Sequence, residues 1–201
     1  MRHGETAWTI TGQHTGYSEI PLTAHGRAQA AALAPVIERL LADRDPVVLA
    51  SPRQRTVQTA ELALPGREPA LDDALREFDY GDYEGLTSAQ INERVPGWTL
   101  WTHSCPHGET IAAASRRVDA LLADLRTESR PIVLVTHGHT SRILTARALG
   151  LPAQMGSILD SATGSLSQLR TVHGELALSL WNYVPAEACI PAEADLSGAG
   201  S

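Results

Sequence analysis

The first residues of the chain are of types that suit the handling of a phosphate group. The guanidinium of Arg2 offers a fixed fork of N–H donors that matches phosphate oxygens. The neutral imidazole of His3 is a nucleophile that can form covalent intermediates, and Gly4 would let the backbone approach a ligand closely. Tripeptides of this kind are common by chance, so the interpretation depends on the residues further along the chain.

Three later residues supply the other parts that phosphoryl transfer needs. The reaction requires a nucleophile, donors for the phosphoryl oxygens and a proton for the leaving oxygen. We expect His3 to be the nucleophile, Arg2 and Arg55 to clamp the phosphate, and His137 to be a further cationic donor. Glu77 is the candidate acid that protonates the leaving alcohol and then activates water, because a nearby dianionic phosphate would raise the pKa of its carboxyl.

Each candidate also has a plain structural interpretation. Arg53 and Arg55 suit the surface of a helix, and Glu77 lies among acidic neighbours that suggest a solvated loop. His137 could bond backbone at a strand end, or form half of a metal site with His139, but no third ligand has a suggestive spacing. Serine hydrolysis is disfavoured because the chain has no Gly-x-Ser-x-Gly elbow.

Two short apolar runs, 46–50 and 131–136, predict buried parallel strands. The first leads into Ser51-Pro52, a helix N-cap with proline at the first helical position, so a helix is expected from Ser51 to about Leu64. The second leads into 137–139 and a helix to about Leu149. Because ligands bind at the carboxyl ends of parallel strands, segments 51–55 and 137–139 are expected at the site.

The remaining segments complete an α/β sandwich with one hairpin. Thr23 predicts the N-cap of a long helix that Pro35 should kink or restart. The hairpin turns at His173-Gly174. The other expected segments are a loop at 7–22, the long helix at 24–43, a loop at 65–86, a short helix at 87–94, an aromatic loop with Trp98 and Trp101, an amphipathic helix at 109–127, and hairpin strands at 165–172 and 176–182.

Composition narrows the class of protein. The chain has 201 residues and 21.5 kDa, enough for one domain with a real core. Its formal net charge of -7 argues against a nucleic-acid partner. No apolar run reaches the roughly 18 residues of a membrane span, and no signal peptide is visible. Two cysteines make no disulfide framework, so we expect a cytoplasmic protein.

An ordered set of motifs resembles a known family. They are Arg2-His3-Gly4-Glu5-Thr6, Pro21-Leu22-Thr23, Ser51-Pro52-x-x-Arg55-x-x-x-Thr59-Ala60, Leu75-x-Glu77, Tyr83-Glu84-Gly85 and His137-Gly138. Over about residues 1–150 the chain resembles the histidine phosphatase superfamily, also called phosphoglycerate mutase-like. Segments 13–16, 79–87, 101–106 and 137–139 are similar to a narrower group that includes actinobacterial acid phosphatases and sedoheptulose-bisphosphatase-like enzymes.

The resemblance implies a fold and a site. The fold is a three-layer α/β/α sandwich with a mostly parallel central sheet, over residues 1–184, followed by a flexible tail at 185–201. The site is a phosphohistidine on His3, a phosphate pocket of Arg2, Arg55 and His137, Glu77 as proton donor, and no metal or other cofactor. Substrate contacts carried over are Thr9, Thr15, Gly16, Tyr80 and the Gly138 amide. Family habit suggests a homodimer.

Three departures from the family pattern matter. Thr9 stands where mutases have an asparagine on the phosphate, although its hydroxyl could donate one bond. The long insert with paired arginines, which mutases use to hold a carboxylate, is absent after Glu84 and this favours hydrolysis. Met1 directly precedes Arg2, so the first family strand is missing; we expect a truncated or misassigned start, the alternative being a fold without that strand.

These observations predict a metal-independent phosphatase that acts on small phosphorylated metabolites, with sugar phosphates favoured. One alternative is a phosphoglycerate mutase, which would return the phosphate to its substrate. An alternative of another class is a phosphate-binding module without turnover. No nucleic-acid or membrane partner is expected.

Overall fold

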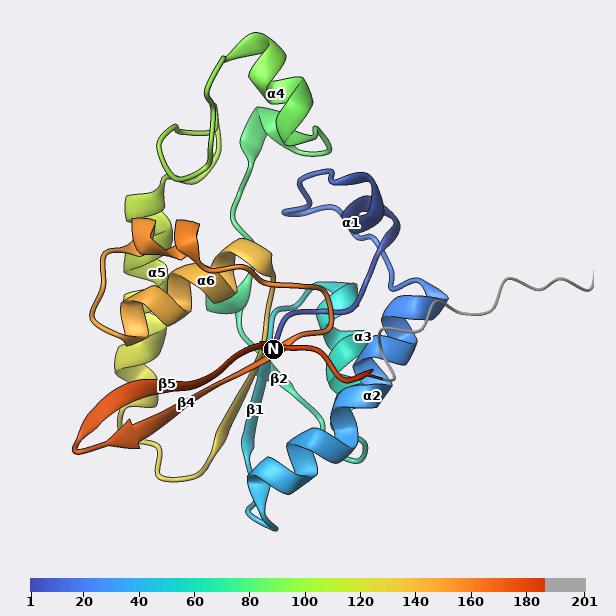
Figure 1. Cartoon of the computed structure of the whole chain (residues 1–201), viewed down its shortest axis with the longest axis vertical. Coiled ribbons are helices and arrows are strands. Elements are labelled where there is room, and N and C mark those ends of the chain that lie inside the picture. The colour runs from blue at the N-terminus through green and yellow to red at the C-terminus, as the bar shows by residue number, and fades with distance from the viewer. Residues whose placement is uncertain (187–201) are drawn as a thin grey trace, which may run out of the picture.

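The centre of the structure is a parallel sheet of three strands. A computed structural model describes residues 1–186 (Figure 1). Strands β1 (Val47–Ala50), β2 (Ala70–Leu71) and β3 (Ile132–Val135) are arranged in the order β2-β1-β3. β1 and β3 pair in parallel along their whole length, from Val47 opposite Ile132 to Ala50 opposite Val135. Both apolar runs of the sequence are therefore confirmed as parallel strands.

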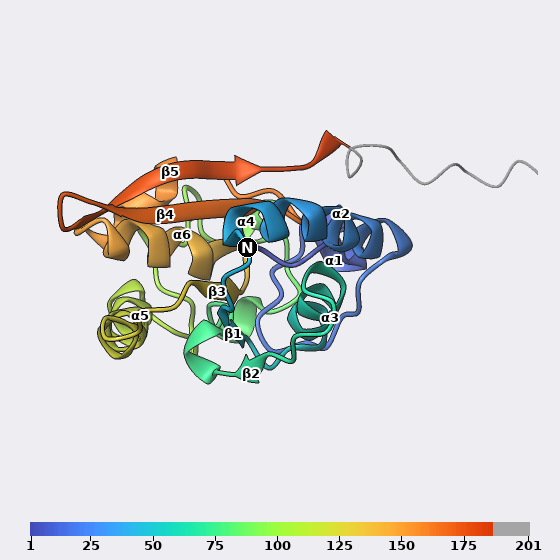
Figure 2. The ribbon, with the colours of Figure 1, turned by 90° about the horizontal axis from the view of Figure 1, so that it is seen from below.

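Helices cover both faces of this sheet. α2 (Ala24–Leu41) and α3 (Gln54–Ala63) lie on one side, and α5 (Ile111–Leu125) and α6 (Gly138–Ala148) on the other (Figure 2). Val48 and Val133 pack into the core with α2 and α3, whereas their neighbours Leu49 and Leu134 pack into the core with α5 and α6. Successive strand residues point to opposite faces, so a strand buried on both sides is apolar throughout. The predicted three-layer α/β/α fold is confirmed.

Helix α2 is continuous through Pro35, contrary to the predicted kink or restart. Thr23 is its N-cap, as predicted, and accepts a hydrogen bond from the Gly26 amide at 2.9 Å. Leu33 and Ile37 flank the proline and are buried against the sheet. Packing of an apolar face stabilises a helix in a protein more than propensity does, which offsets the hydrogen bond that proline removes.

Helix α3 begins two residues later than predicted. Arg53, not Ser51, occupies the N-cap position, and its side chain makes no capping bond. The carboxylate of Glu19 caps the helix instead: it accepts hydrogen bonds from the Gln54 amide at 2.9 Å and from the Arg53 guanidinium. The Ser51 hydroxyl bonds the ring of His137 instead, which the local sequence pattern does not reveal.

Short elements connect the longer ones; the short helix predicted at 87–94 is confirmed, whereas the loops predicted at 7–22 and 65–86 contain helical turns. Helix α1 (Ala7–Thr11) lies within 7–22 and begins at a capping box of Thr6 and Thr9. Five residues are too few for a helical period to show in sequence. The other short elements are two 3₁₀ turns at Asp73–Leu75 and Gly81–Tyr83, helix α4 (Ser88–Arg94) and a 3₁₀ helix at Ala153–Ile158.

The predicted hairpin is confirmed. β4 (Leu166–Val172) and β5 (Glu175–Tyr183) pair antiparallel, and His173 and Gly174 both have positive φ in the turn between them. The hairpin runs along one edge of the molecule, past α6 and toward α2, and Leu166 of β4 packs with residues of α2 (Figure 2). The expected tail falls almost wholly on residues 187–201, outside the described part of the chain.

The chain start lies against β3 and fixes His3. Arg2 forms a parallel bridge with Thr136, and the His3 amide donates to the Thr136 carbonyl at 3.0 Å. On the other side, the Arg2 amide donates to Ser165 O at 3.0 Å. Residues 1–3 thus sit between β3 and the start of β4, beside the sheet.

Gly4 is needed for helix packing and not for a ligand as expected. A Cβ atom on Gly4 would lie 2.2 Å from the carbonyl oxygen of Gly26 in α2. Real Cβ contacts are never so short, so the two glycines let the nucleophile segment touch α2 backbone to backbone.

Candidate active site

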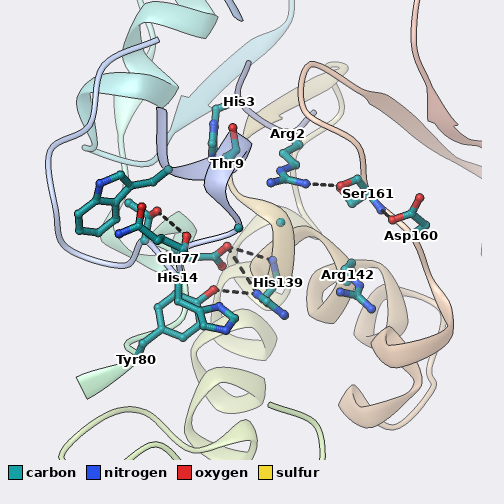
Figure 3. Close-up of a pocket in the computed structure, with 15 residues that line it drawn as sticks. Arg2, His3, Thr9, His14, Glu77, Tyr80, His139, Arg142, Asp160 and Ser161 are labelled. Carbon is teal, nitrogen blue, oxygen red and sulfur yellow. Dashed lines mark hydrogen bonds and ion pairs between the residues drawn. The ribbon is translucent and has the colours of Figure 1, made fainter. Parts of the chain in front are cut away.

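A cavity of about 240 Å³ opens at the carboxyl ends of the strands (Figure 3). It is lined by the chain start, by α1 and the loop after it, by segment 77–80, by the first turn of α6 and by residues 160–161. Predicted site residues that line it are Arg2, His3, Thr9, Thr15, Glu77, Tyr80 and Gly138. Predicted site residues that do not line it are Gly16, Arg55 and His137.

His3 presents one ring nitrogen for chemistry. Its Nδ1 lies 2.7 Å from the Gly4 carbonyl oxygen, and because a carbonyl only accepts, Nδ1 carries the hydrogen. The lone pair then resides on Nε2. Burial lowers the pKa of His3 well below its usual value, and the charges of Arg55 and Arg2 lower it further. The ring is neutral at ordinary pH, which is the form that a nucleophile needs.

His137 lies beside His3 but differs from the cationic donor that we expected. Arg55 Nε donates to its Nδ1 at 3.2 Å, so Nε2 carries the hydrogen and donates to Ser51 Oγ at 2.8 Å. Burial and the charge of Arg55 lower the pKa of His137 well below its usual value. Its ring centroid is 5.2 Å from that of His3. Because the His137 ring is neutral and both of its nitrogens are hydrogen-bonded, it orients Arg55 and Ser51.

Most N–H donors of Arg55 are also hydrogen-bonded to other residues of the protein. Besides the His137 bond, Nη1 donates to Ser18 O at 2.9 Å, and Nη2 donates to Thr15 O and Gly16 O at 3.0 and 3.2 Å. The side chain is fully buried. Three of its five N–H groups therefore hold the 15–18 loop and a fourth holds His137, while one hydrogen on Nη1 is without a partner within residues 1–186.

Arg2 has an N–H donor without a hydrogen-bond partner in the described residues. Nη1 bonds the Ser161 carbonyl, but Nε is buried and bonds no atom of residues 1–186. The guanidinium packs against Gly138, where a Cβ atom would lie 3.3 Å from Arg2 Cζ. A buried N–H without an acceptor is costly, and because Arg2 lines the cavity, an anionic acceptor bound there could satisfy its guanidinium.

Glu77 is held as a carboxylate by the first turn of α6. Oε1 accepts from the Thr140 amide at 2.9 Å and the Phe78 amide at 2.9 Å, and Oε2 accepts from the His139 amide at 3.0 Å. Burial alone would raise the pKa of Glu77, but attraction to His139 and these three amide donors lower it below the usual value. Because His139 is neutral near pH 7, as shown next, the amides account for the ionised form.

Tyr80, which is buried, and His139, which is half-buried, form a hydrogen-bonded pair at the cavity. Their Oη and Nδ1 atoms are 2.7 Å apart. Burial raises the pKa of Tyr80 well above its usual value and lowers that of His139 to about 3. Tyr80 is therefore the donor and His139 Nδ1 the acceptor, which leaves the hydrogen of His139 on Nε2.

The other predicted contacts divide between the cavity and the loop that supports it. The Thr9 hydroxyl donates to Thr6 O at 2.8 Å, so its hydrogen is committed to the α1 cap and not to a ligand. The Thr15 hydroxyl bonds Gln13 O. Gly16 lies behind the cavity, where its amide donates to the Glu84 carboxylate. Gly138 is the first residue of α6, and its amide points out of the helix end.

Sequence reasoning missed several residues that line the cavity. The sequence analysis considered His139 only as half of a metal site and as part of the 137–139 motif, and it considered His14 only as part of the motif at 13–16. Arg142 follows His139 at a spacing of three, which places both on one helix face and was the available signal. The remaining missed residues are Trp8, Gly12, Gln13, Asp160 and Ser161.

Residues 1–186 contain no group of three or more His, Cys, Asp or Glu side chains that could hold a metal ion. No helix within the same residues has the length and apolar character that crossing a membrane requires.

Comparisons with known proteins match this picture. A profile of the histidine phosphatase superfamily (branch 1) matches residues 1–184. An acid phosphatase of Mycobacterium tuberculosis is 43% identical over 183 residues, 90% of this chain and 89% of the relative. A sedoheptulose 1,7-bisphosphatase of Saccharomyces cerevisiae is 32% identical over 77% of this chain and 68% of the relative. The solved structure of an open reading frame product from Mycobacterium tuberculosis has a TM-score of 0.85 and 41% identity, covering 92% of this chain and 95% of that chain.

The fold and the site define an enzyme of the phosphoric monoester hydrolase class. The chain belongs to the histidine phosphatase superfamily, branch 1, and is of the histidine (acid) phosphatase type. The resemblance stated from the motifs is confirmed, and the match reaches beyond the 150 residues that carried them.

Proposed function

We propose that the protein hydrolyses small phosphomonoesters, with sugar phosphates favoured, through a phosphohistidine on His3. The observation that carries this proposal is the His3–Gly4 hydrogen bond, which fixes a neutral ring with its lone pair on Nε2. Arg2, with an unpaired Nε, and Glu77 line the same cavity. Together these side chains supply a nucleophile, a donor for the phosphoryl oxygens and a group that moves a proton.

The proposed reaction has two steps. His3 Nε2 attacks phosphorus while the ester P–O bond breaks, and Glu77 gives its proton to the leaving oxygen. Water then attacks the phosphohistidine, the Nε2–P bond breaks, and Glu77 takes a proton from that water. The cycle returns both residues to their starting forms. Because the nucleophile is a side chain, no metal-bound water is needed.

The phosphoryl oxygens need several donors. Arg2 Nε and the Gly138 amide at the start of α6 are the first candidates, since an anion is favoured at a helix N-terminus. The free Nη1 hydrogen of Arg55 is the third, while His137 holds the Arg55 guanidinium in place. Thr15 and Tyr80 shape the cavity around the substrate.

Glu77 must gain a proton before the first step. In the structure it is ionised, because three amides donate to it. A bound phosphate dianion repels the carboxylate and raises its pKa, so substrate binding itself favours the protonated acid. Protonation is easier at mildly acidic pH, where His3 is still neutral, and we expect the rate to be highest there.

The name of one relative supports the substrate class. The yeast protein is a sedoheptulose 1,7-bisphosphatase, which acts on a phosphorylated sugar, and the mycobacterial relative is an acid phosphatase. We infer that this chain acts on metabolites of similar size.

Phosphate release from a panel of esters tests the proposal. The panel holds p-nitrophenyl phosphate, sedoheptulose and fructose bisphosphates, 3-phosphoglycerate and phosphoserine, assayed at pH 5.5 and 7.5. We expect release that is lost in His3→Ala, whereas an exposed control, His173→Ala, keeps it. Release that survives in His3→Ala would contradict the proposal. Transfer of phosphate between positions of phosphoglycerate without release would indicate a mutase, and binding without turnover would indicate a binding module.

A further inference from the structure

A second cation lines the cavity beyond the catalytic groups. Arg142 lies on α6, one turn after Gly138, and its side chain reaches the same cavity as Arg2 and Glu77 (Figure 3). The proposed hydrolysis uses Arg2, His3 and Glu77 and leaves Arg142 without a role. Burial lowers its pKa, but an arginine stays protonated at ordinary pH, so the cavity holds a positive charge that needs an explanation.

The guanidinium of Arg142 is fixed along one edge and free along the other. Nε donates to Gly156 O at 2.8 Å, and Nη2 donates to Ser157 O at 3.1 Å. Its Cζ lies 4.6 Å from the ring centroid of Trp101. Nη1 bonds no atom of the described residues. A donor held in this way loses little conformational freedom when it binds an anion.

His139 presents a donor beside it. Tyr80 donates to its Nδ1, so the remaining N–H of the ring is on Nε2. The His139 ring centroid is 5.6 Å from that of Trp101, so the imidazole and the Arg142 guanidinium pack against the same indole. Residues three apart on a helix share a face, which agrees with both side chains reaching the cavity.

Among the acidic residues, Asp160 has the largest effect on Arg142: the attraction of its carboxylate raises the pKa of the Arg142 guanidinium. It is committed elsewhere: Oδ1 accepts from the Ser161 amide at 2.8 Å, and Oδ2 is 3.5 Å from Asn182 Nδ2. When Glu77 is protonated, as the first step requires, Arg2 and Arg142 outnumber Asp160 among the charged groups that line the cavity.

We propose that Arg142 and His139 form a subsite for a second anionic group, so that the substrates are phosphomonoesters that carry another phosphate or a carboxylate. The proposal rests on the proposed function, because attack by His3 decides which end of the substrate is the phosphoryl end. Gly138 and Arg142 are about one helical turn apart, roughly 6 Å along α6, which is the scale of a short carbon chain.

Matched substrate pairs test this subsite and separate the two sources of the second anion. Fructose 1,6-bisphosphate is compared with fructose 6-phosphate, and 3-phosphoglycerate with glycerol 3-phosphate. The readout is the ratio of kcat/KM within each pair, measured for the parent, Arg142→Gln and Arg116→Gln. Arg116 is an exposed arginine on α5 and serves as the matched control.

We expect the ratio to fall by about 10- to 100-fold in Arg142→Gln, the usual effect of losing a charged hydrogen bond, and to be unchanged in Arg116→Gln. A fall in the fructose pair identifies a second phosphate, and a fall in the glycerate pair identifies a carboxylate. Equal losses for both members of each pair, or none, would overturn the proposal. His139→Asn, expected to lower the same ratio several-fold, gives the answer if Arg142→Gln does not fold.

Failure of the hydrolysis itself has a different signature. If the parent releases no phosphate, or if His3→Ala still does, the proposed function fails. Calorimetric binding of the same pairs to the parent then tests the subsite alone, and Arg142→Gln must weaken only the members with two anionic groups. Equal binding of both members by the parent would overturn the subsite as well.

Discussion

At the scale of single residues, the site depends on which atom of each side chain is already committed. His3 is bonded through Nδ1 and keeps Nε2, whereas both nitrogens of His137 are bonded by Ser51 and Arg55. Two histidines 5.2 Å apart therefore have different roles. In Glu77 both carboxylate oxygens accept hydrogen bonds from amides, which favours the ionised form. Substrate binding must therefore raise the pKa of Glu77 before it can act as an acid.

Removal of the acid should depend on the leaving group. We predict that Glu77→Gln lowers kcat by about 10²- to 10⁴-fold for an alkyl phosphate such as fructose 6-phosphate, the usual contribution of general acid catalysis. The loss should be much smaller for p-nitrophenyl phosphate, because p-nitrophenolate leaves without a proton. Steady-state rates on both esters check this, with the exposed Glu93→Gln as control. Equal losses on the two esters would show that Glu77 is not the acid.

The buried Ser51 hydroxyl should matter for stability. In Ser51→Ala the Nε2–H of His137 loses its acceptor in a fully buried setting. We predict a loss of about 1–3 kcal/mol in the free energy of unfolding, the cost of an unsatisfied buried donor. Urea denaturation measures it, and the exposed Ser129→Ala should change the value by less than about 0.5 kcal/mol. A Ser51→Ala protein as stable as the parent would contradict the assigned hydrogen bond.

At the scale of elements, the site is assembled where strands end and helices begin. β3 leads into His137 and the first turn of α6, and β1 leads into Ser51 and the turn before α3. The first turn of α6 provides the amides that hold Glu77 and a further amide at Gly138. The chain start is fixed from two sides, by β3 and by the contact between Gly4 and α2.

The contact with α2 leads to a prediction whose sign is opposite to that of helix propensity. Alanine is ordinarily better than glycine in a helix by about 1 kcal/mol. In Gly26→Ala the new Cβ would lie 2.1 Å from the Glu5 carbonyl oxygen, so the segment that carries His3 must move. We predict a lower thermal midpoint together with a lower kcat. A Gly26→Ala protein with a raised midpoint and full activity would show that this contact is looser than the structure indicates.

Some of these elements were visible in the sequence and others were not. The apolar runs at 46–50 and 131–136 and the turn at His173-Gly174 are local patterns, so strands and hairpin were predicted correctly. The start of α3 was wrong because Glu19, 35 residues before Gln54, replaces the local cap. The lowered pKa of His137 was not visible in the sequence either, since it depends on burial and on the charge of Arg55, which only the folded chain brings near.

At the scale of the whole molecule, burial keeps the histidines of the site in their uncharged form. His3, His137 and His139 all have pKa values lowered chiefly by burial, so the site contains neutral rings. Arg2, Arg55 and Arg142 provide the positive charge around them. The overall charge of -7 therefore does not prevent a local preference for anions.

This arrangement predicts that the protein loses stability in acid. In the unfolded chain a histidine takes up a proton below about pH 6.5, whereas the folded chain keeps His3, His137 and His139 neutral to lower pH. The unfolded state then binds more protons, and the free energy of unfolding falls by about 1.4 kcal/mol per pH unit for each such histidine. Glu77 adds a further loss as the pH falls below the ordinary carboxyl value of 4.5 toward its lowered pKa.

Urea denaturation at pH 7.5, 6.5, 6.0 and 5.5 measures this effect. The free energy of unfolding should be nearly constant above pH 6.5 and fall steeply below it, and His139→Gln should show a shallower fall. A free energy that rises as the pH drops from 6.5 to 5.5 would mean that the buried histidines are not held neutral.

The central claim is that phosphate passes through Nε2 of His3, and trapping that intermediate tests it most directly. The enzyme is mixed with fructose 1,6-bisphosphate labelled in its phosphate and quenched in alkali within milliseconds, because phosphohistidine is stable in base and labile in acid. Peptide mapping should then place the label on His3, it should disappear at the rate of turnover, and it should be absent in His3→Ala. Label on His137, or turnover by the parent with no labelled histidine at any time, would contradict the account.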